Sequence, residues 1–129
     1  MRLGYVILYV PNVPATLAFY ERAFGLSRRF LHESKMYGEM ETGGTALAFA
    51  AESLVELNGV TVRPNRRSDP PAGVEIGLVT DDVAAAYRKA VSAGALVYKE
   101  PAEKPWGQTV GYVRDNNGFL VEICSPMGA

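Results

Sequence analysis

Two glutamates, Glu75 and Glu122, are the side chains of this sequence best placed to do chemistry. Each stands in a short, β-rich, apolar segment, VEIGLV for the first and FLVEIC for the second. Two carboxylates in a cleft repel each other, which raises the pKa of one, and such a pair binds a divalent ion, recognises a cationic ligand or moves protons. The sequence contains no Ser-His-Asp set, P-loop or dinucleotide-binding glycine pattern, so it offers no sign of those classes of site.

Aromatic residues are the second candidate feature. Tyr5 and Tyr9 lie in the first β-rich segment, and Trp106, the only tryptophan, stands between Pro105 and Gly107. Aromatic walls around a few polar anchors are typical of small-molecule sites. The alternative is structural: the two tyrosines fill space between sheets, and the tryptophan closes the end of a core or a dimer seam.

The single histidine and the single cysteine contribute less. His32 lies beside Glu33 on a predicted strand away from the glutamates, and we interpret it as a surface residue. Cys124 shares a strand with Glu122 but has no second cysteine or neighbouring basic group, so we expect an unreactive apolar thiol. One cysteine excludes an intrachain disulfide and suits a reducing cytoplasm.

These candidates lie in a sequence that repeats itself. Residues 5–25 and 75–94 both consist of an apolar strand, a helix-starting break, an amphipathic helix and a closing glycine. Leu8 corresponds to Leu78, and the segment 44–48 corresponds to 118–122. An internal repeat of this kind dictates the fold. We predict an α+β structure of two βαβββ modules related by a pseudo-twofold axis.

Turn and cap residues set the predicted elements. The first module is expected to contain a helix between Asn12 and Gly25 and strands at 3–10, 27–33, 36–41 and 45–51. The second is expected to contain a helix capped by Asp81 or Asp82 and strands at 74–80, 95–100, 108–114 and 119–125. Residues 52–72 are predicted to be loose, with some extended structure. We therefore divide a single domain, 1–129, into module one (about 1–57), a linker (58–72) and module two (73–129).

Side-chain alternation along strands places four positions in a shared hollow. Tyr5 and Ala48 face inward in the first module, and Glu75 and Glu122 occupy the equivalent positions of the second. Small neighbours leave volume for a ligand around them: Ala46, Ala50 and Gly77. The face on which Tyr112 lies depends on a hairpin register that the sequence leaves open.

The bulk composition excludes several classes of partner. The chain has 129 residues, enough for one domain with a real core, and a net charge of −1 from 13 basic and 14 acidic residues. No basic stripe indicates nucleic acid, and the apolar runs are too short to cross a bilayer. The apolar N-terminus lacks a signal-peptide cleavage site and stops at Pro11, so we interpret it as a strand.

Short motifs support the repeat and extend over essentially the whole chain: LYVPN at 8–12, FY at 19–20, FGL at 24–26, TDDV at 80–83, AG at 93–94, KPWG at 104–107 and DNNGFLVE at 115–122. In this order and spacing the chain resembles the vicinal oxygen chelate superfamily, which includes glyoxalase I, extradiol dioxygenases, and the fosfomycin- and bleomycin-resistance proteins. The resemblance implies two βαβββ modules and a homodimer. It also implies that the Trp106 loop forms part of a groove in which the indole stacks on a planar ligand.

The resemblance further implies a metal site, which this sequence matches only in part. The usual ligands are His on the first strand, His or Glu on the fifth and Glu on the last, sometimes with a carboxylate on the fourth. The matching positions are Tyr5, Glu75, Glu122 and Ala48. A neutral phenol is a poor ligand and alanine has no donor. We therefore expect no cofactor; if a metal binds, Glu75 and Glu122 would hold Mg²⁺, Mn²⁺ or Ca²⁺ weakly.

Three functions compete. The leading hypothesis is a cytoplasmic, homodimeric binding protein of the bleomycin-resistance type, which sequesters a planar or cationic compound without metal and so confers antibiotic resistance. The second is a divergent metal-dependent lyase or dioxygenase, similar to lactoylglutathione lyase, and the third is an accessory domain with a vestigial cavity. Whether the chain is an enzyme is thus left open. The predicted ligand-binding residues are Tyr5, Tyr9, Ala48, Glu75, Trp106 and Glu122.

Overall fold

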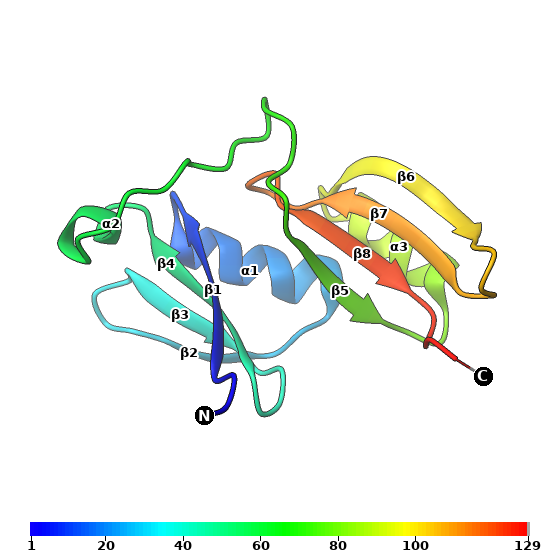
Figure 1. The fold of residues 1–129 in the computed structure, drawn as a ribbon, viewed down its shortest axis with the longest axis horizontal. Helices are drawn as coiled ribbons and strands as arrows, with labels where there is room; N and C mark the ends of the chain where they lie inside the picture. Colours follow the sequence, from blue (N-terminus) through cyan, green and yellow to red (C-terminus); the bar gives the residue numbers. More distant parts are fainter. Residues whose placement is uncertain (129) are drawn as a thin grey trace. The chain divides into compact units, whose positions relative to one another are not determined.

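The computed structural model describes residues 1–128. They divide into two compact units, Met1–Asn65 and the remainder from Arg66. Each unit contains a four-stranded mixed sheet with a helix against one face (Figure 1). The predicted α+β class, with the order βαβββ in each half, is confirmed. None of the helices in the described part of the chain is long and apolar enough to cross a lipid bilayer.

The first unit has the strand order β1-β4-β3-β2. The outer strand β1 pairs in parallel with β4, and the other pairs are antiparallel. The helix α1 packs on β3 and β4. The elements are β1 (Tyr5–Val10), α1 (Val13–Phe24), β2 (Arg28–Leu31), β3 (Tyr37–Met40), β4 (Ala46–Ala51) and the one-turn helix α2 (Leu54–Leu57).

The second unit repeats this arrangement with the order β5-β8-β7-β6. Here β5 pairs in parallel with β8, and α3 packs on β6, β7 and β8. The elements are β5 (Glu75–Val79), α3 (Val83–Ser92), β6 (Leu96–Glu103), β7 (Thr109–Arg114) and β8 (Leu120–Cys124). Every predicted strand has a counterpart, with ends that differ by a few residues.

Both long helices begin at cap residues that are visible in the sequence, and α1 ends at its predicted glycine. The Asn12 side chain accepts a hydrogen bond from the Ala15 N–H at 3.0 Å, and Gly25 ends α1 with a φ of 68°. Of the two candidate caps for α3, the structure selects Asp82, which accepts from the Ala85 N–H at 3.0 Å. A side-chain oxygen at this position satisfies a backbone donor that has no partner within the helix.

Two elements depart from expectation. Residues 52–72 were predicted to be loose, but the one-turn helix α2 forms at 54–57. Its last turn is closed by the hydrogen bond from Asn58 N–H to Leu54 O at 2.8 Å. Strand β6 extends beyond the predicted end through Pro101 to Glu103. Proline lacks an N–H donor, but β6 is an edge strand with two register irregularities, which is where a sheet tolerates proline.

Candidate functional site

The face of the second sheet opposite α3 carries the predicted glutamates. The register pairs Glu75 with Leu120 and Gly77 with Glu122. Because cross-strand partners point to the same side of a sheet, Glu75 and Glu122 share this face, one step apart along adjacent strands. We call this surface the acidic face and define it by Glu75, Gly77, Tyr112, Glu122 and Cys124.

The two carboxyl groups of the acidic face interact directly. Gly77 has no side chain, and even a Cβ at this position would lie 4.0 Å from Glu122 Oε2, so the carboxyl of Glu122 has room above it. The pKa of Glu75 is raised, first by partial removal from water, then by the negative charge of Glu122 and by a hydrogen bond to it. A hydrogen bond between two carboxyl groups needs a proton on one of them, and the raised pKa makes Glu75 the group that keeps its proton to higher pH.

Tyr112, on the neighbouring strand β7, contacts Glu122 of the carboxyl pair. The register pairs it directly with Glu122, and its hydroxyl donates a hydrogen bond to Glu122 Oε1 at 3.1 Å. The structure thus settles the face on which Tyr112 lies. Burial, followed by the hydrogen bond to Glu122, raises the pKa of Tyr112 to about 12, so the phenol is a neutral donor over the whole physiological range.

Cys124 belongs to the same face but offers no nucleophile. Its side chain is buried, and its Sγ lies 3.7 Å from the Leu78 carbonyl oxygen. Burial, then the hydrogen bond to Glu122, raises the pKa of the thiol to about 11. The reactive thiolate is therefore scarce at neutral pH, in keeping with the unreactive thiol expected from the sequence.

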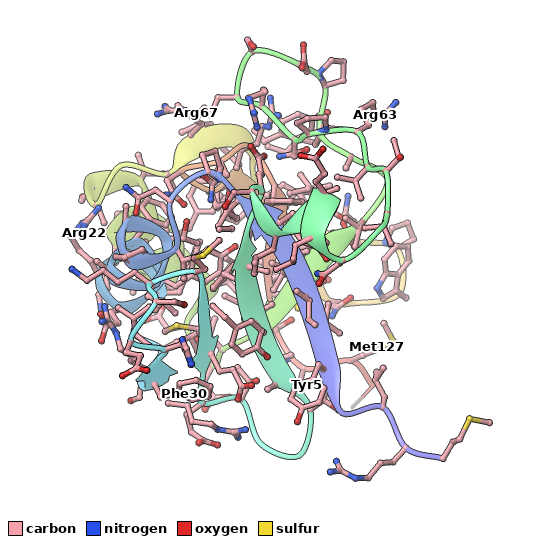
Figure 2. The ribbon with its side chains drawn as sticks, turned by 90° about the vertical axis from the view of Figure 1, so that its left-hand side faces the viewer. Tyr5, Arg22, Phe30, Arg63, Arg67 and Met127 are labelled. Atoms are coloured by element: carbon pink, nitrogen blue, oxygen red, sulfur yellow. The ribbon has the colours of Figure 1, made fainter. Side chains whose placement is uncertain are left out.

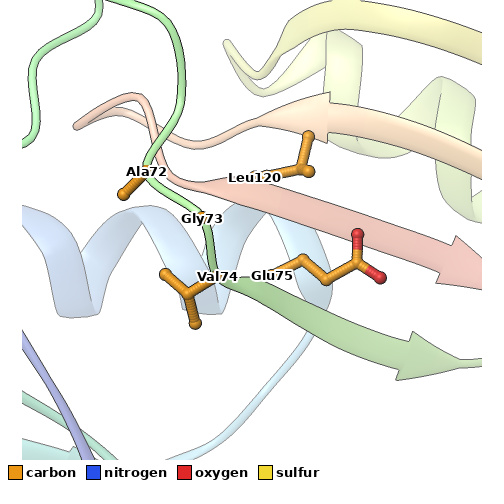
Figure 3. Close-up of a pocket in the computed structure, with 5 residues that line it drawn as sticks. All are labelled: Ala72, Gly73, Val74, Glu75 and Leu120. Carbon is orange, nitrogen blue, oxygen red and sulfur yellow. The ribbon is translucent and has the colours of Figure 1, made fainter.

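A pocket opens beside Glu75, at the start of β5. It has a volume of about 210 Å³ and is lined by Ala72, Gly73, Val74, Glu75 and Leu120 (Figure 3). This volume is below the range of about 300–1,000 Å³ usual for drug-sized ligands. The pocket suits part of a ligand or a small group, with one titratable side chain in its wall.

The first sheet has a corresponding face opposite α1. The register pairs Tyr5 with Ala46, Ile7 with Ala48 and Tyr9 with Ala50, so these residues share one side, as alternation predicted. Tyr5 is 57% exposed at the start of β1 (Figure 2). Ala48 is fully buried, and the Tyr9 hydroxyl accepts a hydrogen bond from Asn58 Nδ2 at 3.0 Å.

The sequence analysis missed a carboxylate on this face. Glu39 is the register partner of Ala48 and is only 6% exposed. It accepts a hydrogen bond from the Tyr37 hydroxyl at 2.7 Å, and Arg29 donates to its other oxygen at 3.3 Å. Burial and then the bond to Glu39 raise the pKa of Tyr37. Alternation along β3 would have found the residue, because Met40 faces the core and Glu39 must therefore face the other way.

Arg29 compensates the charge of Glu39. Its guanidinium contacts Glu39 at 3.3 Å and forms two hydrogen bonds to Glu41, at 2.8 and 2.9 Å. The bond to Glu41 is the largest cause of the raised pKa of Arg29, and the bond to Arg29 is the largest cause of the lowered pKa of Glu41. The first sheet thus holds its buried carboxylate within an ionic network.

Trp106 lies at the end of the second sheet, in the turn between β6 and β7. It is 63% exposed, and its Nε1–H donates to Gln108 Oε1 at 2.9 Å. Gln108 is buried and in turn donates to the Ser125 carbonyl at 2.9 Å, which fixes the indole in place. Gln108 is four residues before Tyr112, roughly 13 Å along an extended strand. Trp106 is therefore at the rim of its unit.

Within each sheet, the predicted positions correspond. Tyr5 on β1 and Ala48 on the adjacent strand β4 are offset by one pairing step on the same face. Glu75 on β5 and Glu122 on β8 have the same offset. In each sheet the next strand contributes a polar side chain to this face. Glu39 of β3 is the register partner of Ala48, and Tyr112 of β7 is the register partner of Glu122. The convergence of all four predicted positions on one point stays a prediction.

The donor set does not fit a catalytic transition metal. Within residues 1–128, no group of three or more His, Cys, Asp or Glu side chains is close enough to hold a metal ion. The acidic face offers two carboxyl groups, one of them with a raised pKa, together with a neutral phenol and a neutral thiol. Borderline metals such as Zn²⁺ prefer imidazole or thiolate ligands.

The family model of the glyoxalase/bleomycin resistance protein/dioxygenase superfamily matches residues 2–123. The chain belongs to this superfamily. Solved structures agree on the fold. A glyoxalase-related enzyme from Fulvimarina pelagi is 24% identical, with a TM-score of 0.82 over 99% of this chain and 93% of that chain. A superfamily enzyme from Burkholderia phytofirmans PsJN is 21% identical, with a TM-score of 0.78 over 97% and 98%.

A third structure, from Nocardioides, is described as a glyoxalase/bleomycin resistance protein/dioxygenase. It is 21% identical, with a TM-score of 0.76 over 100% of this chain and 85% of that chain. At such identities these superfamily structures establish the fold alone. No functionally curated protein matches the chain in sequence. The resemblance drawn from the motifs is thereby confirmed at the level of family and fold.

Proposed function

We propose that this protein binds a small planar or cationic molecule on the acidic face, without a resident metal and with Glu75 and Glu122 as its polar anchors. One observation supports this most: among the described residues, arginines form ion pairs with Glu21, Glu39 and Glu41, and neither Glu75 nor Glu122 takes part in one. Two carboxyl groups that lack a basic partner favour a ligand that brings its own positive charge or N–H donors.

Tyr112 contributes to selectivity in this proposal. Its hydroxyl already donates to Glu122 Oε1, which orients the carboxyl group, and a carboxylate has further lone pairs with which it would accept from a ligand. Exposed Trp106, held by Gln108, would add a flat apolar surface at the rim for a ligand long enough to reach it. Tyr5, Tyr9 and Ala48 of the first unit stay in the proposed ligand-binding set by resemblance.

The test uses two planar probes that differ in charge. Proflavine is a cation at mildly alkaline pH, whereas acridine is neutral there. We expect calorimetry to show proflavine binding and acridine binding more weakly. Glu122→Gln should weaken proflavine binding about tenfold, which is the usual effect of losing one charge-assisted hydrogen bond. The control Glu100→Gln changes net charge equally on the exposed edge strand β6 and should leave affinity within about twofold.

Two outcomes contradict the proposal. Equal binding of the two probes, or an equal loss in both variants, would show that the acidic face does not recognise charge. A stoichiometric metal, bound to protein purified without chelator and lost in Glu122→Gln, would instead support the metal-dependent lyase or dioxygenase. The homodimer, the cytoplasmic location and a role in antibiotic resistance stay predictions.

A further inference from the structure

The most buried basic side chain of the second unit is that of Arg114, the last residue of β7. It is only 9% exposed. Its guanidinium donates to three main-chain carbonyl oxygens: Nε to Gly118 at 2.9 Å, Nη1 to Arg67 at 3.1 Å and Nη2 to Arg66 at 3.1 Å. Burial of a guanidinium is costly unless its donors are satisfied, so these bonds tie the segment at 66–67 to the β7–β8 turn.

The β7–β8 turn itself is shaped to receive that segment. Gly118 has a φ of +88°, and a Cβ there would lie 2.8 Å from Arg66 O and 2.7 Å from Arg114 Nη2. No real Cβ approaches other atoms so closely. The contact therefore requires glycine both for its backbone conformation and for the close passage of another main chain. The close passage involves the same Arg66 carbonyl that Arg114 binds, so both features hold the same segment.

Residues 66–74, which we call the strap, lead from this junction to the pocket. Arg66 O also accepts from the Asp69 N–H at 3.2 Å, and Val74 N–H donates to Ala72 O at 2.8 Å. The strap ends where Glu75 pairs with Leu120, and Leu120 is also the register partner of Arg114. Both ends of the strap are thus held on the same β7–β8 hairpin, and its last residues line the pocket (Figure 3).

We propose that Arg114 is a positioning residue: by holding 66–67 it fixes the strap and so forms the pocket wall beside Glu75. Ligand affinity would then depend on a side chain that does not line the pocket. The role at the ligand rests on the proposed function, whereas the role in holding the strap does not. Partial burial is the leading cause of the raised pKa of Glu75, and the strap residues Ala72, Gly73 and Val74 line the pocket beside it.

Arginine is required for this role because two adjacent carbonyls are held at once. The planar fork of the guanidinium spans Arg66 O and Arg67 O with separate nitrogens. A lysine ammonium carries the same charge as a single point and does not reproduce that fork. Arg114→Lys therefore keeps the charge and removes the clamp. Arg88→Lys, the same change on the exposed side of α3, is the matched control.

The first experiment needs no ligand. Trypsin cleaves after Arg66 and Arg67, at the two carbonyls that Arg114 holds, and Arg63 is protected by the proline that follows it. We expect both bonds to resist trypsin in the folded wild type and in Arg88→Lys. In Arg114→Lys cleavage should be about tenfold faster or more, because a charge-assisted bond to each carbonyl is lost. Equal rates in Arg114→Lys and Arg88→Lys would overturn the proposal.

The second experiment separates positioning from general destabilisation. Carbon-detected NMR of the Glu75 carboxyl should show its pKa moving down toward its ordinary value in Arg114→Lys, as water reaches the released pocket. An unmoved pKa would overturn the role at the pocket. Proflavine affinity is a third measurement, and we expect it to fall in Arg114→Lys. If proflavine does not bind the wild type, the proposed function fails while trypsin and NMR still decide the role of Arg114.

A second variant covers the case in which Arg114→Lys does not fold. Gly118→Ala keeps the guanidinium but pushes the Arg66 main chain away, so it should also expose the two bonds to trypsin. The wild type gives a further check without any substitution. Cleavage after Arg66 or Arg67 under native conditions as fast as in a short peptide would show that the strap is not held, and would overturn the proposal.

Discussion

The faces opposite the two helices carry the same kind of hydrogen-bonded pair in different electrostatic settings. In the first unit Tyr37 donates to Glu39 at 2.7 Å, and Arg29 contacts the same carboxylate at 3.3 Å. In the second, Tyr112 donates to Glu122 at 3.1 Å, and the next charged group is the carboxyl of Glu75. One pair is neutralised within its own sheet, and the other is not.

This difference shows how two units of the same βαβββ order can place their carboxylates in different electrostatic environments. A buried carboxylate with an arginine and a phenol as donors has its charge compensated and needs no ligand. A carboxylate beside a second carboxyl group raises the free energy of the folded protein unless a proton or a cation is present. We therefore assign a structural role to Glu39, and the same contrast supports the binding role proposed for Glu122.

The largest expected effect is the loss of the compensated pair. Glu39→Ala leaves the Tyr37 hydroxyl and one Arg29 nitrogen without their acceptor, so the free energy of unfolding should fall by about 2–3 kcal/mol. Glu122→Ala should cost under about 1 kcal/mol, because it also removes the repulsion of Glu75. Urea denaturation of both variants measures the difference.

The control for that comparison is Glu41→Gln. It breaks an exposed contact of the same arginine without touching the buried carboxylate, so its effect should be small and should vanish at high salt. Equal losses in Glu39→Ala and Glu122→Ala would contradict the assignment of different roles to the two faces.

A smaller effect is expected in the hairpin turns of the two units. The turn between β2 and β3 places Lys35 at a φ of 62°, whereas the turn between β6 and β7 places Gly107 at a φ of 91°. Left-handed backbone costs a residue with a side chain roughly 1 kcal/mol relative to glycine. Lys35→Gly should therefore raise the thermal midpoint of the protein, and Gly107→Ala should lower it. No change in either variant would show that the turns bear no strain.

The smallest expected effect is a pH-dependent gain from Glu75→Gln. The folded state raises the pKa of Glu75, so it binds more protons than the unfolded chain. The unfolding free energy therefore falls as pH rises above the ordinary carboxyl pKa of about 4.3. Because Glu75 is solvent-exposed, Glu75→Gln should be more stable than wild type at neutral pH by under about 1 kcal/mol, and equal to it in acid. Thermal unfolding across this pH range measures the gain, and a variant less stable at neutral pH would sink the account.

Much of the fold was predictable because local signals and the repeat agreed. Asn12, Asp82 and Gly25 mark helix ends, and alternation along β1 and β5 assigned their faces. The one-turn helix α2 was not predictable, since four residues carry too little periodicity to distinguish a helix from a loop. Strand β6 continues past Pro101 because it lies at the edge of its sheet. The sequence of that segment does not indicate whether the strand is at an edge.

The candidate site was predictable in part for the same reason. Strand alternation and the internal offset identified Glu75 and Glu122 because both are properties of the chain taken along its length. Glu39 was missed because alternation was not carried to β3, whereas Tyr112 needed the register of the β7–β8 hairpin. The contact of Arg114 with Arg66 and Arg67 joins residues more than 40 positions apart, which no local pattern contains.

Taken alone, the amino-acid order determined the family, the two βαβββ units and the side of each strand on which a residue lies, because these follow from local propensity and periodicity. Tertiary structure alone decided which charges are neutralised. That outcome depends on which side chains of separate strands come within hydrogen-bonding distance, as Arg29 does with Glu39 and Tyr112 with Glu122. Electrostatic energy depends on distance in space and on exposure to water, and neither is set by separation along the chain.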